Sequence, residues 1–363
     1  MIIFIVEIIT LIYLLFREFG KTLSVEESTK RYGHLSYFYN GKFHPAEEPL
    51  YEPKKVTKSS LSKGSINDFI SMIFLSFDAP KKPFPQLYLE KSSFPPQPEN
   101  FSLYWLGHSS TIIELNNKRL IIDPVLDNAS PIFVGVPRYT KRVIERDNLP
   151  DLDYIIITHN HYDHLERKTV ISFKKGHFIV PLGIKYTLEG WGIKSERITE
   201  LGWGDIFEDD FIKIIAEEAQ HFSGRYLLDE NRTLFNSYLL LGKNNINIFW
   251  SGDTGYQKHF KRISEQYNIT FDLIALEMDA YNTGWRNCHL FPKEVIKAAL
   301  DLKATKLFPI HWAVFDLAFH PWHESIDLVI KEAENTGINI ITPMLGEKIN
   351  LDSITQRWWN GQI

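Results

Sequence analysis

The chain has 363 residues, of which 44% are apolar and 14% aromatic, enough to bury the core of one large domain or of two modest ones. Its 40 basic and 45 acidic side chains give a net charge of −5, and no long basic run occurs, which argues against nucleic acid as a partner. The single cysteine, Cys288, excludes an internal disulfide framework and a cysteine-rich metal site. Any metal site must therefore use histidine and carboxylate ligands.

Residues 1–17 begin with MIIFIVEIITLIYLLF, which is apolar except for Glu7 and lacks the basic start and the cleavage site of a secretory signal. As a helix, residues 1–16 would span roughly 24 Å, less than the bilayer core of about 30 Å. Because no polar face recurs at helical spacing, we interpret residues 1–17 as a membrane-associating helix; the alternative is a core or interface helix. The sequence leaves open whether this segment spans the membrane, lies on it or avoids it. Basic residues follow it and favour a cytoplasmic catalytic domain: Arg17, Lys21, Lys30 and Arg31.

Residues 18–99 are interpreted as an extension that packs on the core. They contain a lysine- and serine-rich stretch (54–65) typical of a loop, a short apolar run INDFISMIFLSF that predicts a helix, and proline-rich connections. A catalytic domain is expected from residue 100 to residue 352, where strand-like runs become frequent. Residues 353–363 are interpreted as a C-terminal tail.

Short apolar runs typical of strands follow one another from residue 101 onwards: LYWLG, TIIEL, RLIID, YIIIT, HFIVP, FIKIIA, SYLLLG, INIFWSG, FDLIAL and KLFPIH. The early runs are joined by tight turns such as NNK, as in antiparallel meanders. The later runs alternate with stretches that predict helices: 163–174, 256–267, 292–302 and 324–335. This mixture predicts an α/β sandwich whose sheets are covered by helices on their outer faces.

Histidines and carboxylates recur directly after these apolar runs. The sequence THNHYDHL (158–165) places four of them after YIIIT, and single ones follow three later runs: His159, His161, Asp163 and His164, then His221, Asp253 and His311. An apolar strand fixes the position of the residue just beyond it. Four such strand ends gathered at one edge would therefore form a rigid site.

The residue types in this set suit a pair of divalent metal ions. Imidazole nitrogens and carboxylate oxygens are ligands for zinc and neighbouring metals. In an extended segment His159 and His161 project to the same side, whereas Asp163 and His164 turn away and can reach a second ion. Seven ligands are too many for one tetrahedral ion but suit two ions that share a carboxylate. Two ions about 3.5–4 Å apart can hold a hydroxide between them, which predicts hydrolysis of phosphate or carboxylate esters.

The H-x-H-x-D-H pattern, followed by lone His, Asp and His residues at strand ends, resembles the metallo-β-lactamase superfamily. The resemblance implies an αββα sandwich with a two-metal site between the sheets. It also implies two ligand groups joined by a bridging carboxylate: His159, His161 and His221 on one ion, Asp163, His164 and His311 on the other, and Asp253 between them. Zn²⁺ is the expected metal, although manganese and iron accept the same ligands.

A narrower resemblance extends from about residue 17 to residue 350. The blocks WLGHSSTIIEL, LIIDPVLDNASP, AQHFSGR, FWSGDTGY, CHLFPKEV and PIHWAVFDLAFHPWHE are similar to the N-acylphosphatidylethanolamine-hydrolysing phospholipase D family. REFGK and YFYNGKFHP resemble the N-terminal extension of its bacterial members. The resemblance implies phospholipase D-type cleavage of a phospholipid by a metal-bridging hydroxide, which releases phosphatidic acid and an N-acylethanolamine.

Two other functions remain open at this point. The same ligand set would serve a hydrolase of a small soluble lactone or cyclic phosphate ester, and a metal-dependent binding or scaffold protein without turnover is the third interpretation. The expected partners of the leading interpretation are a phospholipid or another phosphodiester and a membrane surface. The oligomeric state is left open, including a homodimer.

Three residues are the catalytic candidates: Asp253, Asp163 and His289. Asp253 is expected to position the nucleophile or to accept its proton. His289 corresponds by resemblance to a histidine in the mouth of the active site, as a proton donor or phosphate contact. The alternative for His289 is a loop residue that caps the helix beginning at Pro292.

Several neighbouring residues have two interpretations each. Asp123, in LIIDP, either orients a ligand histidine or caps a turn before Pro124. His108 is interpreted as a structural or supporting residue in preference to a catalytic one. Arg225 and Arg232 are interpreted as solvated surface charges in preference to phosphate donors. Five aromatic residues are either core or an open apolar wall for a lipid chain: Trp285, Trp312, Phe315, Phe319 and Trp322.

Overall fold

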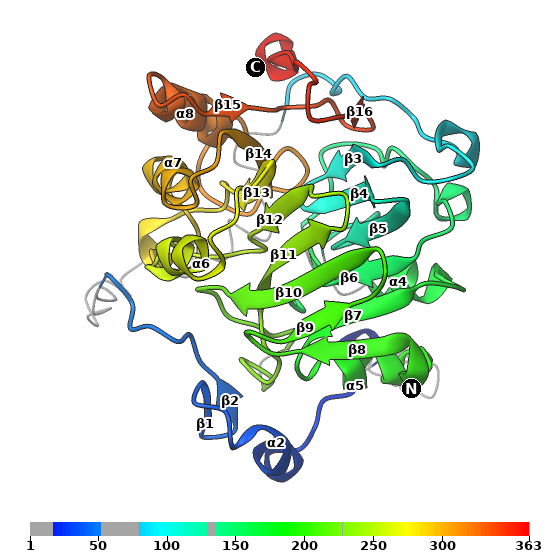
Figure 1. Ribbon diagram of the computed structural model, residues 1–363, viewed down its shortest axis with the longest axis vertical. Helices are drawn as coiled ribbons and strands as arrows, with labels where there is room; N and C mark the ends of the chain where they lie inside the picture. Colours follow the sequence, from blue (N-terminus) through cyan, green and yellow to red (C-terminus); the bar gives the residue numbers. More distant parts are fainter. Residues whose placement is uncertain (1–16, 52–79, 130–135, 227, 363) are drawn as a thin grey trace, which may run out of the picture.

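The computed structural model describes residues 17–51, 80–129, 136–226 and 228–362, and two seven-stranded sheets form its centre (Figure 1). The first sheet has the order β16-β3-β4-β5-β6-β7-β8. Its strands are β3 Phe101–Gly107, β4 Ser110–Leu115, β5 Lys118–Ile122, β6 Tyr154–Ile156, β7 His177–Pro181, β8 Ile198–Leu201 and β16 Lys348–Ile349.

The second sheet has the order β15-β14-β13-β12-β11-β10-β9. Its strands are β9 Ile206–Glu208, β10 Ile212–Glu218, β11 Asn236–Gly242, β12 Asn247–Trp250, β13 Leu273–Glu277, β14 Lys306–Ile310 and β15 Asn339–Ile340. Pairing is antiparallel from β3 to β5, from β9 to β12 and between β16 and β3, and it is parallel from β5 to β8 and from β12 to β15. This division confirms the predicted change from meanders to strand–helix alternation.

The tight turn predicted from NNK joins β4 to β5. Asn116 and Asn117 have φ values of 48° and 63°, in the left-handed region that asparagine tolerates better than most residues. Two successive residues of this kind match the right-handed twist of the strands they connect. The turn therefore fixes the register in which Leu115 pairs with Lys118.

Helices cover the outer face of each sheet, so the layers follow the order helix, sheet, sheet, helix (Figure 1). Beside the second sheet lie α6 His259–Tyr267, α7 Pro292–Asp301 and α8 Glu324–Ala333; beside the first lie α4 Arg167–Ser172 and α5 Ile184–Gly190. Short 3-10 helices occur at Lys91–Ser93, Arg146–Asn148, Ser195–Arg197, Thr283–Trp285 and Trp358–Gly361. The αββα sandwich predicted for the catalytic part of the chain is confirmed.

The helix predicted at 163–174 begins later than expected. The backbone N–H groups of His164 and Leu165 both donate to the carbonyl of His161, at 3.1 and 2.8 Å, and form a turn ahead of α4. α7, in contrast, begins at Pro292 as predicted, and Glu294 accepts a hydrogen bond from the backbone N–H of Phe291 at 3.1 Å. The difference places Asp163 and His164 in a turn, where their side chains can face the same space.

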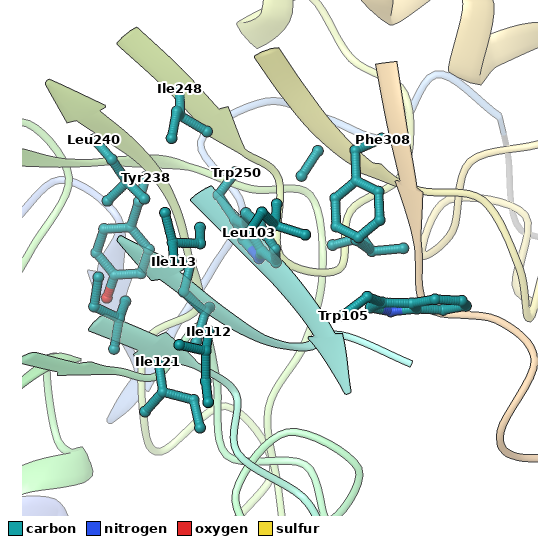
Figure 2. Packing of buried hydrophobic residues seen from close by; sticks show 14 of the residues in the cluster. Leu103, Trp105, Ile112, Ile113, Ile121, Tyr238, Leu240, Ile248, Trp250 and Phe308 are labelled. Atoms are coloured by element: carbon teal, nitrogen blue, oxygen red, sulfur yellow. The ribbon is translucent and has the colours of Figure 1, made fainter. Parts of the chain in front are cut away.

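Side chains from both sheets meet in one continuous core (Figure 2). Fully buried residues are Leu103, Trp105, Ile112, Ile113 and Ile121 from the first sheet and Tyr238, Leu240, Ile248, Trp250 and Phe308 from the second. The ring of Trp105 meets that of Phe308 edge to face across the sandwich, at 6.2 Å between centroids. Burial of each such side chain stabilises the fold by about 1.5–3 kcal/mol, so the core holds the strand ends rigidly.

One part of the predicted extension lies at the lower edge of the sandwich in Figure 1, whereas its residues 80–99 run through the upper part of the view. The lower part contains α2 Val25–Tyr32, β1 Phe38–Tyr39 and β2 Lys42–Phe43. Tyr32, Phe38 and Phe43 form a small core with Leu234 of the sandwich, and Trp191 Nε1 donates to the carbonyl of Arg17 at 2.9 Å. At the other end of the chain, Trp358 and Trp359 are buried against the ring of Trp312. The domain boundaries at residues 17, 99 and 352 stay predictions.

Three predictions lie outside the described residues: the apolar segment 1–16, the loop 54–65 and the helix INDFISMIFLSF. In the ranges given above, the chain forms no helix whose length and apolar character would let it cross a bilayer.

Candidate metal centre

The seven predicted ligands come from the ends of strands in both sheets. His159, His161, Asp163 and His164 follow β6 of the first sheet, whereas His221, Asp253 and His311 follow β10, β12 and β14 of the second. The structure brings all seven side chains together in two adjoining groups. Because the two sheets face each other, the group of four and the three later residues approach from opposite layers.

The first group consists of His159, His161, His221 and Asp253, with one potential ligand atom of each within 4.8 Å of the others. His161 Nδ1 lies 2.8 Å from His159 Nε2 and 3.3 Å from His221 Nε2. Asp253 Oδ2 lies 3.8 Å from His159 Nε2 and 3.7 Å from His221 Nε2. Three imidazole nitrogens and one carboxylate oxygen therefore converge on one point.

The second group consists of His108, Asp163, His164 and His311. Asp163 Oδ2 lies 3.4 Å from His164 Nε2 and 3.3 Å from His311 Nε2. Asp253 reaches this group as well, with Oδ1 3.2 Å from His164 Nε2 and Oδ2 3.0 Å from His311 Nε2. The carboxylate of Asp253 thus faces both groups at once, as the bridging position requires.

The separations between these atoms fit shared metal ions. Two ligand atoms bound to one tetrahedral zinc ion at 2.0–2.2 Å lie roughly 3.3–3.6 Å apart, close to most of the distances above. His164 Nε2, His311 Nε2 and Asp253 Oδ1 are buried and make no hydrogen bond. Buried polar atoms without partners are rare in proteins, and one cation in each group would satisfy all three. The residues present therefore fit a pair of divalent metal ions.

The charges of the two groups differ. Burial lowers the pKa of His159 well below its usual range and lowers the pKa values of His161 and His221 to about 3, so these rings are neutral and present lone pairs. Burial also opposes protonation of His311, but the carboxylates of Asp253 and Asp163 raise its pKa to about 10. The buried carboxylates thus attract positive charge to the second group, which a divalent ion would supply.

Asp123 orients one of the ligand histidines. Its Oδ2 accepts hydrogen bonds from His164 Nδ1 at 2.8 Å and from Thr158 Oγ1 at 2.7 Å, and its Oδ1 accepts from the Thr158 backbone N–H at 2.8 Å. Because Nδ1 of His164 carries the proton, Nε2 is free to face the site. Of the two interpretations of Asp123, the structure supports the orientation of a ligand.

Two further contacts fix side chains at the centre. His221 Nδ1 donates to the carbonyl of Cys288 at 2.9 Å, which leaves Nε2 for the first group. His108 Nε2 lies 3.0 Å from Asp163 Oδ2, and the His108 carbonyl accepts from the Trp105 indole and from the His311 backbone N–H. His108 and His311 both have φ values in the left-handed region, 53° and 72°, which are strained for histidine. The supporting role predicted for His108 agrees with these contacts.

His289 lies beside the ligands, with its ring centroid 5.1 Å from that of His221 and 5.2 Å from that of His311. Burial lowers its pKa to about 4. Its Nδ1 lies 3.4 Å from Glu277 Oε1, which accepts the backbone N–H of Leu290 at 2.7 Å. His289 therefore has the position, at the edge of both groups, that the resemblance implied.

Sequence reasoning missed Glu277. This residue ends β13 and is fully buried. Burial is the main cause that raises its pKa well above the usual range, and the negative charge of the nearby Asp253 adds to the effect. The signal was present in the sequence, because Glu277 directly follows the apolar run FDLIAL, as Asp253 follows INIFWSG. The position of β13 between β12 and β14 brings its end to the same edge as the metal ligands.

The interpretation of Arg225 as surface charge was wrong. Arg225 is buried and donates to the carbonyls of Asn160 at 2.9 Å, Leu165 at 2.8 Å and Glu18 at 3.2 Å, and it stacks over the Tyr162 ring at 4.0 Å. These contacts hold the two ends of the turn that carries His161, Asp163 and His164. Arg225 thus stabilises the ligand-bearing turn.

Most of the aromatic residues near the last ligand belong to the core. Trp312, Phe315 and Trp322 are buried, whereas Trp285 and Phe319 are partly exposed. Phe222 was not predicted to matter, yet its side chain is 40% exposed and its ring lies 4.5 Å from His161 and 4.8 Å from His221. An exposed phenyl group therefore stands directly beside the first ligand group.

Comparisons with known proteins place this site in a family. A family model described as the beta-lactamase superfamily domain matches residues 118–312. The chain is 36% identical over 254 residues to an uncharacterized protein of Mycobacterium tuberculosis, covering 68% of each chain. It is 32% identical over 231 residues to N-acyl-phosphatidylethanolamine-hydrolyzing phospholipase D 1 of Caenorhabditis elegans, covering 59% of this chain and 64% of the worm protein.

Solved structures support the fold. The isothiocyanate hydrolase from Delia radicum gut bacteria superposes with a TM-score of 0.55 at 16% identity, covering 69% of this chain and 98% of that chain. An identity this low shows the fold alone. From the family match, the two-sheet sandwich and the clusters of histidine and aspartate, we conclude that the chain belongs to the beta-lactamase superfamily, as a metal-dependent hydrolase of the metallo-β-lactamase fold.

Proposed function

We propose that the chain is a dinuclear metal-dependent phosphodiesterase that hydrolyses N-acylphosphatidylethanolamine or a related phospholipid in the manner of a phospholipase D. The observation that carries the proposal is the position of Asp253, whose oxygens lie 3.2 Å from His164 Nε2, 3.0 Å from His311 Nε2 and 3.7 Å from His221 Nε2. One carboxylate shared by two ligand groups suits two ions that act on one phosphodiester. Similarity to the worm phospholipase D supports the substrate class.

Two divalent ions, which we propose to be Zn²⁺, supply Lewis-acid activation of water and of the phosphoryl oxygens when they are bound. The protein's own groups position the reaction around them. Asp123 and the Cys288 carbonyl fix the tautomers of His164 and His221, so that each directs Nε2 into the site. Asp253 and Asp163 contribute the negative charge that orients the attacking water and accepts its proton.

His289 is proposed to protonate the leaving alkoxide or to contact the phosphate. Its Nδ1 lies 3.4 Å from Glu277, which leaves Nε2 as the nitrogen available to the substrate. Burial lowers its pKa to about 4, so the free ring is neutral, and the proton that it passes to the leaving alkoxide comes from the attacking water.

A lipid substrate agrees with the apolar surface beside the centre. Phe222, 40% exposed, packs against two ligand histidines, and Leu228 in the same loop is 82% exposed. We propose that this loop meets the acyl or glyceride part of the lipid, and that residues 1–17 hold the catalytic domain at the cytoplasmic face of a membrane. Removal of residues 2–16 should reduce co-sedimentation with phospholipid vesicles; unchanged co-sedimentation would contradict the membrane role of this segment.

The test of the function combines metal analysis with two classes of substrate. Purified protein should hold about two equivalents of metal per chain and release phosphatidic acid from vesicles that contain N-acylphosphatidylethanolamine. Asp253→Asn should abolish this activity. Protein that holds two metals but cleaves only soluble lactones or cyclic phosphates would favour the alternative hydrolase. Protein inert toward both classes would contradict an enzymatic function.

A further inference from the structure

A cavity separate from the metal centre lies away from the predicted ligands. Its volume is about 390 Å³, and its walls come from the loop after β5, from residues 138–142 and from the start of α4. None of the seven predicted metal ligands lines it. Among the residues that do are Arg138, Thr140, Arg142 and Lys168.

Arg138 is the unusual side chain in this cavity. Its Nη1 donates to the carbonyl of Val125 at 3.1 Å, whereas Nε and Nη2 are buried and have no hydrogen-bond partner. Among the residues the structure describes, no carboxylate lies within ion-pair distance of it. Burial lowers the pKa of Arg138 to about 10, so the side chain is still charged at neutral pH. Buried guanidinium nitrogens that make no hydrogen bond are costly unless a ligand supplies the acceptors.

The carboxylates around the cavity are already neutralised. Asp127 pairs with Arg146 at 2.7 Å and with Arg142 and Lys168 at 3.3 Å. Glu166 pairs with Arg146 at 2.6 Å and accepts the backbone N–H groups of Leu126 and Asp127 at 2.7 and 3.0 Å. These acids therefore have partners of their own, and Arg138 is left over.

Within the described part of the chain, Arg138 is the cation of the wall that lacks a carboxylate partner. The wall contains three carboxylates, Glu18, Asp127 and Glu166, and three cations, Arg138, Arg142 and Lys168. Glu18 pairs with Arg167 at 3.4 Å, so each of the three carboxylates has a cationic partner other than Arg138.

Thr140 adds a second unsatisfied group to the same wall. Its Oγ1 is buried and has no hydrogen-bond partner. A hydroxyl donor and the free guanidinium edge formed by Nε and Nη2 together match the several oxygens of a tetrahedral oxyanion, which accepts more hydrogen bonds than a chloride ion. A cavity of about 390 Å³ has room for such a group and a small substituent.

We propose that this cavity binds a phosphate-type dianion, whose oxygens pair with the guanidinium of Arg138 and the hydroxyl of Thr140. The site is distinct from the metal centre. Arg138 lies 5.5 Å from the ring of Phe315, and the same ring lies 5.0 Å from His108, so aromatic side chains stand on the route between the two. The phosphate belongs to a free metabolite or to a lipid head group, and the proposal does not depend on the reaction at the metal centre.

The test is calorimetric titration of the full metal-loaded chain with inorganic phosphate against chloride at matched ionic strength. Wild-type protein should bind phosphate saturably. Arg138→Gln should weaken this binding at least about tenfold, because two charge-assisted hydrogen bonds are lost. Arg31→Gln, which removes an arginine with a 51% exposed side chain on α2, is the matched control and should leave the affinity unchanged.

Further variants separate this site from the metal centre. Asp253→Asn should retain Arg138-dependent binding, since it alters only the metal centre. Should Arg138→Gln fail to fold, Thr140→Val, which preserves shape, should still weaken binding several-fold. Saturable binding that survives Arg138→Gln and is lost in Asp253→Asn would overturn the proposal, as would the absence of saturable binding to wild type. Titration with glycerol phosphate and with phosphatidic acid vesicles then distinguishes a metabolite from a lipid head group.

Discussion

Replacement of Asp123 by asparagine should weaken one metal site and spare the other. Asp123 is fully buried and contacts Thr158 and His164, both within 2.8 Å. The asparagine carbonyl must face the Thr158 backbone N–H, because this group can only donate, whereas the Thr158 hydroxyl and the His164 imidazole at the other oxygen can also accept. The amide nitrogen therefore faces His164 Nδ1, so the proton of the imidazole moves to Nε2, the atom that faces the second ligand group.

The size of the effect follows from this change of tautomer. Loss of a group that orients a metal-bound histidine typically costs 10- to 100-fold in metal affinity, or about 1.4–2.7 kcal/mol. His159, His161 and His221 make no hydrogen bond to Asp123, so the first group should keep its affinity. Titration with zinc in competition with a chromophoric chelator should therefore resolve one weakened site and one unchanged site.

The matched control for this experiment is Glu114→Gln. Glu114 is also a fully buried carboxylate, but it pairs with Arg119 at 2.6 Å within the first sheet, away from the ligands. This variant should lose stability and keep both metal affinities. If Asp123→Asn binds both metals with wild-type affinity, the orienting role is refuted. If Glu114→Gln weakens zinc binding to the same extent, the effect is one of general stability.

Four further predictions concern stability and turnover. Arg225→Ala should lower the free energy of unfolding in urea by about 3 kcal/mol, because two buried carbonyls and one partly buried carbonyl lose their donor. A loss below about 0.5 kcal/mol would contradict the contacts of Arg225. Glu277→Ala should lower kcat about tenfold, because His289 loses the carboxylate beside its Nδ1, and the variant should retain its metal content. Steady-state kinetics and metal analysis test this together: a loss of metal would show that Glu277 has only a structural role. Removal of metal by a chelator should lower the melting temperature by several degrees, since only the folded chain gathers the ligands, and an unchanged melting curve would argue against metal binding at this site. Stability should fall as the pH drops from 6.5 towards 3, because burial lowers the pKa of His259 to about 3 and the unfolded chain binds the proton first; His259→Gln should flatten this pH profile in urea titrations.

The ligands could be predicted from the sequence because each follows an apolar run. A buried strand fixes the position of the residue at its end, and the alternation of strands with helices brings those ends to one edge of each sheet. The turn around Asp163 could not be predicted, since hydrogen bonds from His164 and Leu165 to the His161 carbonyl delay α4. The sequence pattern does not show that a turn forms at these residues in place of the first turn of the helix.

Arg225 shows why other roles could not be predicted. Its acceptors belong to Asn160, Leu165 and Glu18, which are distant in sequence. The residues next to Arg225 in the sequence therefore do not show whether its side chain is buried or exposed to water. Arg138 is similar, because the contacts that its guanidinium makes, with the Val125 carbonyl and the Phe315 ring, depend on where those residues lie in the fold. The surroundings of both arginines follow from tertiary packing alone, whereas Glu277 could have been identified by the rule that found Asp253.

The division of the ligands between the two sheets also has a consequence during synthesis. The first four come from the half of the chain that is made first, but the first ion can be enclosed only after Asp253 has left the ribosome, and the second only after His311 has followed. A nascent or truncated chain that ends before residue 253 offers histidines without the carboxylate that joins the two groups. Capture of metal is therefore a late step, and cells that synthesise this protein must supply the ions to a nearly completed polypeptide.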